Sequence, residues 1–268
     1  MPPKISIIIP HYNMPAFLPR AVESVAFQDY ENIELIIVDD GSDSEQLIVI
    51  NEQLSVNRGV DVKFLRIDHA GKPVAVNRGF KEATGDYLII LDADDLLPAN
   101  SISIRLKALE ADDADLCLGS FLTMYRGRTK GYRGISKISG KKYYALSRAL
   151  LTRVVSPFHQ NAMMFSRQLL NRAGQMDPRM IRGQDKDFAL RLLQKSHKTT
   201  FVDETVYFYN RYHRPRKVRL YNRFLGTKFL VVIACRYFKG FNRLIYLAWI
   251  AFIGSAKMVY DVFGVYKK

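Results

Sequence analysis

A fully apolar run that ends in a cluster of carboxylates constrains this chain more than any other feature. Leu88 to Leu91 is apolar at every position, which is typical of a strand covered on both faces in a mostly parallel sheet. Asp92, Asp94 and Asp95 follow directly. Ligands bind at the carboxyl ends of strands in open α/β sheets, and two aspartates separated by one residue can direct oxygen ligands at one hard cation. The segment predicts a metal-assisted site for a phosphorylated ligand, and a helix-capping turn is the alternative.

Apolar runs of strand length alternate with helical spacing along the first hundred residues. The runs are Ile5–Ile9, Ile33–Val38 and, more weakly, Val62–Ile67, ahead of the run at Leu88. Between the first two, Phe17–Phe27 carries apolar side chains at the spacing of one helix face. Strands that alternate with helices indicate βαβ units and a mostly parallel sheet flanked by helices.

Polar residues follow the strong apolar runs, as Pro10–Asn13, Asp39–Asp43 and the cluster that begins at Asp92. Because the carboxyl ends of parallel strands meet at one edge, these side chains are expected to gather there. The chain contains neither GxGxxG nor GxxxxGK[ST], which argues against a Rossmann dehydrogenase and a P-loop NTPase. Phosphate groups would therefore be met by a cation and side chains rather than by a glycine-rich loop.

The second half of the chain contains another acidic cluster. Asp185 and Asp187, just after Gly183, lead into the apolar Phe188–Leu193. This order places both carboxylates at a helix amino terminus, where the helix dipole favours negative charge. A simple helix cap is the alternative. Residues 100–116 and 167–173 also show helical spacing, residues 162–165 resemble a strand, and Tyr125–Lys142 is interpreted as a loop or edge excursion.

The net charge of +14 is concentrated at one end of the chain. From Arg211 to Lys268 there are 13 Lys or Arg residues against one acidic residue, Asp261. Because these charges are interleaved with aliphatic runs rather than exposed aromatic platforms, a nucleic-acid-binding protein is the weaker interpretation. We expect a near-neutral body over residues 1–212 and a basic, apolar helical tail over residues 213–268.

The tail is expected to associate with a membrane surface without crossing it. Its longest uncharged run, Leu244–Ala256, has 13 residues, whereas a spanning helix needs about 20. Basic residues mixed with Phe, Tyr, Leu and Trp249 are typical of a helix lying on an anionic membrane. Packing on the catalytic body or an oligomer interface is the alternative.

The compartment is expected to be reducing and cytoplasmic. Cys117 and Cys235 are far apart and form no CxxC pair, so neither a disulfide framework nor a structural zinc site is indicated. Met1–Lys4 leads into an apolar run that is too short for a signal peptide. With the basic tail, these features predict a peripheral position on the inner face of the cell membrane.

Five segments, in this order, resemble family-two inverting glycosyltransferases of the GT-A fold. They are Ile5–Asn13, Leu35–Asp43, Gly71–Gly79, Gly85–Asp95 and Gly183–Leu192. Each motif alone is weak, but the ordered set is specific, and the likeness covers about residues 4–212. It implies a GT-A type nucleotide-diphospho-sugar transferase fold with a C-terminal basic amphipathic helical extension.

The resemblance assigns one group of residues to the nucleotide. Pro10, Tyr12 and Asp40 correspond to residues that frame the base, with Asp40 placed to accept from a uracil imide. Asp39 is the alternative to Asp40. A second group, Lys72 and Asn77, matches the segment that passes beside the nucleotide.

Further residues are assigned to the ribose, the metal and the acceptor. The resemblance places Asp92 near the ribose, Asp94 on a Mg²⁺ or Mn²⁺ that bridges the donor diphosphate, and Asp185 as the general base. Asp187 is the competitor for the base role, and Asp95 is released to capping. His213 is a candidate metal ligand, although Arg211, Arg214 and Arg216 could equally bind the diphosphate. Two further expectations concern Gln184, where many relatives carry Glu, and the range 125–160, where acceptor residues are expected.

The expected function is inverting transfer of a sugar from a nucleotide-diphosphate donor, in particular a UDP-sugar, to a hydroxyl of a glycan or lipid-linked acceptor. A divalent cation neutralises the charge that develops on the leaving diphosphate, while a base on the other face of the sugar takes the acceptor's proton. The alternatives are a nucleotidyltransferase that uses the same paired aspartates and metal, and a basic nucleic-acid-binding protein.

Overall fold

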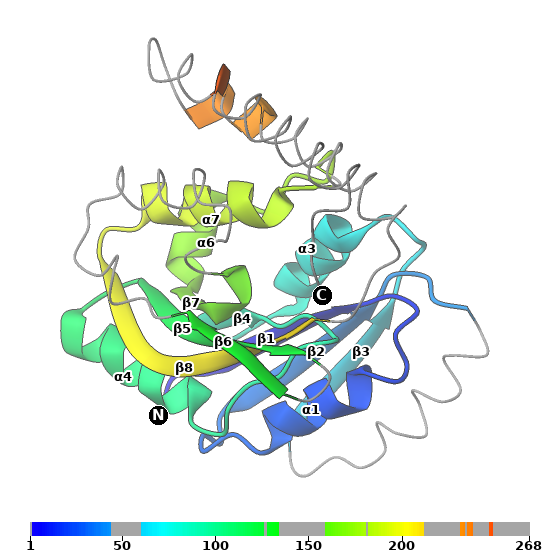
Figure 1. Cartoon of the computed structure of the whole chain (residues 1–268), viewed down its shortest axis with the longest axis horizontal. Coiled ribbons are helices and arrows are strands. Elements are labelled where there is room, and N and C mark those ends of the chain that lie inside the picture. The colour runs from blue at the N-terminus through cyan, green and yellow to red at the C-terminus, as the bar shows by residue number, and fades with distance from the viewer. Residues whose placement is uncertain are drawn as a thin grey trace, which may run out of the picture.

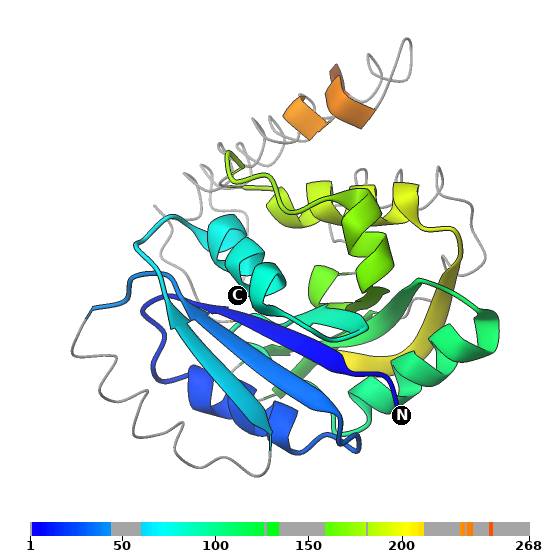
Figure 2. The ribbon, with the colours of Figure 1, turned by 180° about the vertical axis from the view of Figure 1, so that it is seen from behind.

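The computed structural model describes residues 2–43, 60–125, 128–133, 159–180, 182–211, 231–233, 235–237 and 247–248. Within these ranges, one sheet lies between two layers of helices (Figures 1 and 2). The strands are β1 (Ile5–His11), β2 (Ile33–Asp39), β3 (Asp61–Arg66), β4 (Tyr87–Ile90), β5 (Leu116–Tyr125), β6 (Arg128–Arg133), β7 (Met163–Ser166) and β8 (Thr199–Arg211). The helices are α1 (Leu18–Ala26), α3 (Lys72–Glu82), α4 (Ser101–Asp112), η1 (Gln160–Ala162), α6 (Arg167–Ala173) and α7 (Gln184–Lys195).

The sheet has a parallel half and a mixed half. Its order is β3-β2-β1-β4-β7-β5-β6, with β8 pairing with β5. The pairs β1–β2, β2–β3 and β1–β4 are parallel. In the other half β7 is antiparallel to β4 and β5, β6 is antiparallel to β5, and β8 is parallel to β5. The parallel half brings the carboxyl ends of β1, β2 and β4 to the same edge of the sheet, as expected.

Alternate residues of the central strands pack into two separate hydrophobic cores, one on each face of the sheet. Ile8 and Ile36 face α3, α6 and α7, whereas Ile7 and Ile37 face α1 and α4. Burial on both faces explains why these strands are apolar at every position. At Gly79 an added Cβ would lie 2.4 Å from Ile8 Cγ2. The glycine therefore lets α3 pack directly on β1, which fixes the position of the residues at the start of α3.

The elements expected from the sequence are largely present. The expected helices at 17–27, 100–116 and 167–173 correspond to α1, α4 and α6, and the strand at 162–165 corresponds to β7. Within Tyr125–Lys142, residues 128–133 form the edge strand β6, and residues 126–127 and 134–142 lie outside the described residues.

Described parts of the expected tail pack against the body of the protein. Residues 231–233 and 235–237 are helical. Ile233 is 0% exposed and belongs to the same core as Phe188 of α7, while Tyr237 and Leu247 pack against that core. Packing on the body, the alternative for the tail, thus holds for these residues. No helix in the described ranges is long and apolar enough to cross a bilayer.

Candidate active site

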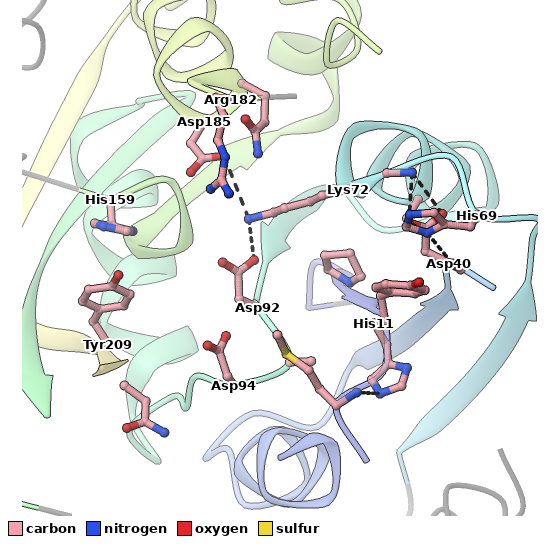
Figure 3. Close-up of a pocket in the computed structure, with 18 of the residues that line it drawn as sticks. His11, Asp40, His69, Lys72, Asp92, Asp94, His159, Arg182, Asp185 and Tyr209 are labelled. Atoms are coloured by element: carbon pink, nitrogen blue, oxygen red, sulfur yellow. Dashed lines mark hydrogen bonds and ion pairs between the residues drawn. The ribbon is translucent and has the colours of Figure 1, made fainter. Parts of the chain in front are cut away.

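A cavity of about 1010 Å³ opens at the carboxyl edge of the parallel half-sheet. Residues that follow β1, β2 and β4 line it, together with the start of α3 and the turn that begins α7. Figure 3 shows His11, Asp40 and His69 on one side, Lys72, Asp92 and Asp94 in the centre, and His159 and Tyr209 on the opposite side. The cavity therefore joins the sequence segments that the resemblance singled out.

The first side of the cavity is built around Asp40. Its carboxylate accepts hydrogen bonds from the backbone N–H groups of Ala70 (2.8 Å) and Gly71 (2.9 Å), and His69 Nδ1 lies 3.0 Å from Asp40 Oδ2. Gly41 permits this approach, because its φ is +74° and an added Cβ would lie only 2.7 Å from the backbone nitrogen of His69. These contacts hold the Asp40 carboxylate at the cavity wall.

Tyr12 and His69 form an aromatic pair beside Asp40. Their rings are stacked with centroids 4.1 Å apart, and Tyr12 remains 42% exposed. Pro10 lines the cavity next to them. His69 did not emerge from the sequence reasoning, although its place after β3, beside the end of β2, was a usable signal. An exposed aromatic face next to a fixed carboxylate suits a planar base that carries an N–H donor.

Asp39 lies beneath this wall rather than on it. It is fully buried, and its carboxylate contacts His11 Nδ1 (3.0 Å) and accepts from the Ser42 N–H (3.1 Å). His11 Nε2 in turn accepts from the Met14 N–H at 3.2 Å. The Asp39 oxygens hold the turns after β1 and β2 together, and Asp40 rather than Asp39 lines the cavity. This favours Asp40 for the base, and the choice between them stays a prediction.

Lys72 lies between Asp92, at the centre of the cavity, and Asp185, at the start of α7. Its Nζ lies 2.6 Å from Asp92 Oδ1 and 4.0 Å from Asp185 Oδ1. Burial acts to lower the pKa of Lys72, but the two carboxylates outweigh it and the pKa is raised. Burial likewise acts to raise the pKa of Asp92, yet Lys72 keeps it below its ordinary value. Both groups are charged at neutral pH, and the ammonium is available to anionic ligands.

Asp92, Asp94 and Asp95 each offer one oxygen within 4.8 Å of the others. This is the hard, all-oxygen donor set that Mg²⁺ and Mn²⁺ accept. Asp92 and Asp94 line the cavity, so the residues present fit a divalent cation there. The capping alternative is wrong for the next helix, because α4 begins at Ser101, its N-cap residue is Asn100, and no side chain caps it.

Asp95 differs from its two neighbours because it is turned into the protein. It is 1% exposed and accepts from the Tyr207 hydroxyl, from the Asn210 N–H at 2.7 Å and from Asn161 Nδ2 at 3.3 Å. Burial, with Asp92 and Asp94 nearby, raises its pKa well above the ordinary value. The capping role expected for Asp95 is therefore wrong: it ties the turn after β4 to strand β8.

The first turn of α7 also carries two carboxylates with opposite surroundings. The Asp185 side chain is 41% exposed and lines the cavity, and among the described residues its Oδ1 makes no hydrogen bond. The Asp187 side chain is 1% exposed, with Arg191 Nε 3.0 Å and Arg236 Nη1 2.6 Å from its two oxygens. The positive φ of Gly183, +73°, starts this turn. Asp187 therefore makes a poor base, because both of its oxygens are already bound.

Asn77 does not face the cavity. Its amide donates to the Met176 carbonyl (2.8 Å) and accepts from the Met176 N–H (2.9 Å). Both ends of the Asn77 amide thus brace the segment after α6, and the expectation that the segment with Lys72 and Asn77 passes beside the nucleotide stays a prediction. His213, Arg214 and Arg216 lie outside the described residues, as does most of the range 125–160.

The opposite wall contains residues that the sequence reasoning did not single out. The His159 ring lies 4.8 Å from the Tyr209 ring and 5.8 Å from the Tyr207 ring, between centroids. Burial lowers the pKa of His159 despite the opposing effect of Asp185, so its imidazole is neutral at pH 7. Arg182 lies near Asp185 (Figure 3) and lines the cavity, as does Gln184, which the sequence had already marked. His159 does lie within the range expected for acceptor residues.

Residues 6–174 match the family model described as glycosyl transferase family 2. The chain belongs to this family. A Haemophilus influenzae protein described as an uncharacterized glycosyltransferase is 36% identical over 105 residues, which are 39% of this chain and 42% of that protein. Glycosyltransferase GlyG of Streptococcus pneumoniae is 35% identical over 119 residues, 44% of this chain and 38% of GlyG. The matches thus span less than half the length of these curated relatives.

Solved structures confirm the expected GT-A type fold. S. aureus TarS 1–349 in complex with UDP-GlcNAc has a TM-score of 0.68 at 14% identity, covering 92% of this chain and 71% of that one. Mannosyltransferase PcManGT from Pyrobaculum calidifontis, in complex with GDP-Man and Mn²⁺, has a TM-score of 0.66 at 18% identity, covering 99% and 81%. At these identities the likeness establishes the fold of this family member.

Proposed function

We propose that this family member is an inverting glycosyltransferase that moves a sugar from a UDP-sugar to a hydroxyl of a glycan or lipid-linked saccharide. One observation carries the proposal: a single cavity is lined by a base-sized aromatic and carboxylate edge, by Asp92 and Asp94, and by the exposed carboxylate of Asp185. A sugar nucleotide needs these three parts in that order, for its base, its diphosphate and the reacting carbon.

The donor would be held at two points. Tyr12 would stack on the base while Asp40 accepts from the uracil imide N–H. Lys72 would contribute a positive charge near the ribose and the diphosphate. The complexes of TarS with UDP-GlcNAc and of PcManGT with GDP-Man support a nucleotide sugar as the donor class.

A divalent cation, Mg²⁺ or Mn²⁺, would be held by Asp94 with Asp92 beside it. When bound, it supplies neutralisation of the negative charge that develops on the departing diphosphate. Asp95 orients the turn that carries both carboxylates through its bonds to Tyr207 and Asn210. The expected further ligand, His213, remains part of this proposal.

Asp185 would act as the general base. Its partly exposed carboxylate can accept the proton of an acceptor hydroxyl as that oxygen attacks the anomeric carbon. The C–O bond to the nucleoside diphosphate breaks in the same displacement, so the configuration at that carbon inverts. The acceptor would approach between Asp185 and the His159–Tyr209 wall.

The place of action in this proposal is the inner face of the cell membrane. The basic excess between Arg211 and Lys268 supports attraction to an anionic surface. Sedimentation with phosphatidylserine-containing vesicles, compared with neutral vesicles and with duplex DNA, tests this part separately from catalysis. Binding to duplex DNA but not to anionic vesicles would contradict it.

The central test is a screen of nucleotide sugars for metal-dependent hydrolysis, because a transferase can pass the sugar slowly to water. We expect release of free UDP, dependent on Mn²⁺ or Mg²⁺, and an inverted anomeric configuration by proton NMR. Release of pyrophosphate would indicate a nucleotidyltransferase. No turnover with any donor in the presence of metal would contradict the proposal.

A further inference from the structure

A partly buried ion-pair cluster joins the described residues 235–237 to the turn that carries Asp185. Arg236 Nη1 lies 2.6 Å from Asp187 Oδ1, and the Tyr237 hydroxyl donates to the same oxygen at 3.1 Å. The other carboxylate oxygen of Asp187 is bound by Arg191 of the same helix at 3.0 Å. Asp187 therefore takes one partner from its own helix and two from a segment about fifty residues further along the chain.

The same arginine reaches a second element. Arg236 Nη2 lies 3.1 Å from Asp177 Oδ2, in the segment between α6 and α7. That segment is also held by Asn77 of α3 through Met176. Arg236 thus bridges the start of α7 to a segment attached to α3, and α3 begins with Lys72. Two cavity residues, Lys72 and Asp185, lie on elements that this arginine connects.

The contact is anchored by apolar packing as well as by charge. Ile233, three residues before Arg236 in the chain, is 0% exposed and packs into the core with Phe188. Tyr237 packs against the same core, and its one hydroxyl hydrogen is shared between Asp187 Oδ1 and the Asp187 carbonyl oxygen, which lies 3.3 Å away. The described residues around Arg236 are therefore attached to the body of the protein both by the buried Ile233 side chain and by the contacts with the Asp187 carboxylate.

Asp185 lies between two fixed points of one helical turn. On one side, the Gly183 carbonyl oxygen accepts hydrogen bonds from the backbone N–H groups of Lys186 (3.0 Å) and Asp187 (2.9 Å). On the other side, the Asp187 carboxylate is held by Arg191, Arg236 and Tyr237. Asp185 Oδ1 makes no hydrogen bond among the described residues, and its ion pair with Lys72 is long, at 4.0 Å. The direction of the Asp185 side chain therefore depends on how firmly the turn itself is held.

We propose that Arg236, assisted by Tyr237, is a positioning residue that holds the first turn of α7 through Asp187 and so aims Asp185 into the cavity. The segment around 231–237 would then set the turnover rate in addition to any role at a membrane. This inference rests on the proposed role of Asp185 as base. Small displacements of a catalytic group reduce turnover strongly, by up to ~100-fold for about 1 Å.

The test compares Arg236→Gln with Arg179→Gln in the full-length protein. Arg179 is the matched control because it also pairs with Asp177 (2.9 Å) but its side chain is 82% exposed and makes no contact with Asp187 in the described ranges. Metal-dependent hydrolysis of the most active donor from the screen is measured together with UDP affinity by calorimetry. For Arg236→Gln we expect kcat to fall by at least ~10-fold with UDP affinity within ~2-fold. Arg179→Gln should keep both.

A double-mutant cycle separates positioning from a general loss of folded protein. If Arg236 acts through Asp187, Asp187→Asn combined with Arg236→Gln should reduce kcat no further than the more damaging single change. Independent, multiplicative effects would overturn the inference. So would equal losses of turnover and of UDP-binding stoichiometry, because they indicate unfolding.

Asp185→Asn distinguishes the failure of this inference from the failure of the proposed function. If Asp185→Asn is inactive and Arg236→Gln has normal kcat, only the positioning role fails. If Asp185→Asn retains normal turnover, the base assignment itself fails. A smaller loss in Tyr237→Phe than in Arg236→Gln is expected, because that change removes only one hydroxyl from the cluster.

Discussion

The turn after β4 and the first turn of α7 each contain carboxylates in two different surroundings. In each, one or two acids face the cavity while a neighbour is buried and bound by partners distant in sequence. Asp94 and Asp185 line the cavity; Asp95 is held by Tyr207 and Asp187 by Arg236. The comparison teaches that an acid-rich motif contains both the reactive group and the group that fixes the turn carrying it.

The two turns differ in what surrounds their buried acid. Asp95 is bound by a hydroxyl, a backbone N–H and an amide, all without charge. Asp187 is bound by two arginines. Burial, with Asp92 and Asp94 nearby, raises the pKa of Asp95. The turn after β4 thus relies on neutral hydrogen bonds, and the turn of α7 relies on ion pairs.

Among changes in the turn after β4, Asp94→Ala should cause the largest loss of turnover. Removing an oxygen ligand from the set at the cavity should reduce metal-dependent turnover by at least ~10³-fold, because a bound cation supplies several kcal/mol of transition-state stabilisation. The free energy of unfolding should change by less than about 1 kcal/mol. Turnover within threefold of the unmodified protein at saturating Mn²⁺ would contradict the assignment of Asp94.

Asp95→Ala should act on stability rather than on metal binding. It leaves the Tyr207 hydroxyl and the Asn210 N–H without their acceptor, which should lower the free energy of unfolding by about 3 kcal/mol. Urea denaturation measures this loss. A matched Tyr207→Phe change should cost about half as much, since it removes one donor and leaves the carboxylate two others. Unchanged stability in both variants would show that Asp95 does not hold the turn to β8.

Glu34 is a buried carboxylate outside the cavity, and it can be compared with Asp95 and Asp187. Burial acts to raise its pKa, but hydrogen bonds from the Ser6 hydroxyl and the Thr84 N–H outweigh it and lower the pKa to about 2 from the ordinary 4.5. Because the folded-state pKa is depressed, the stabilisation is present above pH 4.5 and is lost as pH falls through about 2. Glu34→Gln should lower the free energy of unfolding at pH 7 by up to about 3 kcal/mol.

The measurement for Glu34 is denaturant unfolding at several pH values between 7 and 2. In Glu34→Gln the acid-induced loss of stability below pH 4.5 should be smaller than in the unmodified protein, because the titrating group is absent. An identical pH profile for the two proteins would show that Glu34 does not contribute in this way.

The sequence was sufficient to predict the parallel half of the fold. Apolar runs at Ile5–Ile9, Ile33–Val38 and Leu88–Leu91 mark strands buried on both faces, and that pattern depends only on local composition. The mixed half was harder, because β7 and β8 are placed by pairing with β5 over long sequence separations. No local pattern encodes which neighbour a strand chooses.

The candidate site was predictable up to the choice between neighbouring acids. The motifs correctly marked the segments that line the cavity, but they could not distinguish Asp40 from Asp39 or Asp185 from Asp187 by local pattern. Those choices depend on distant partners such as Arg236 for Asp187 and His11 for Asp39. His159 was missed as an individual residue for the same reason, since only the fold brings it beside Tyr209.

The most direct test of the central claim is to measure turnover and unfolding for Asp185→Asn and Asp187→Asn side by side. We expect Asp185→Asn to reduce turnover by ~10²- to 10⁴-fold, the range for loss of a general base, with a free energy of unfolding within about 1 kcal/mol of the unmodified protein. Asp187→Asn should lower turnover less, by about 10-fold as for Arg236→Gln, and should also lower the free energy of unfolding by about 3 kcal/mol or more, because Arg191 and Arg236 lose their partner. Near-normal turnover in Asp185→Asn would contradict the account.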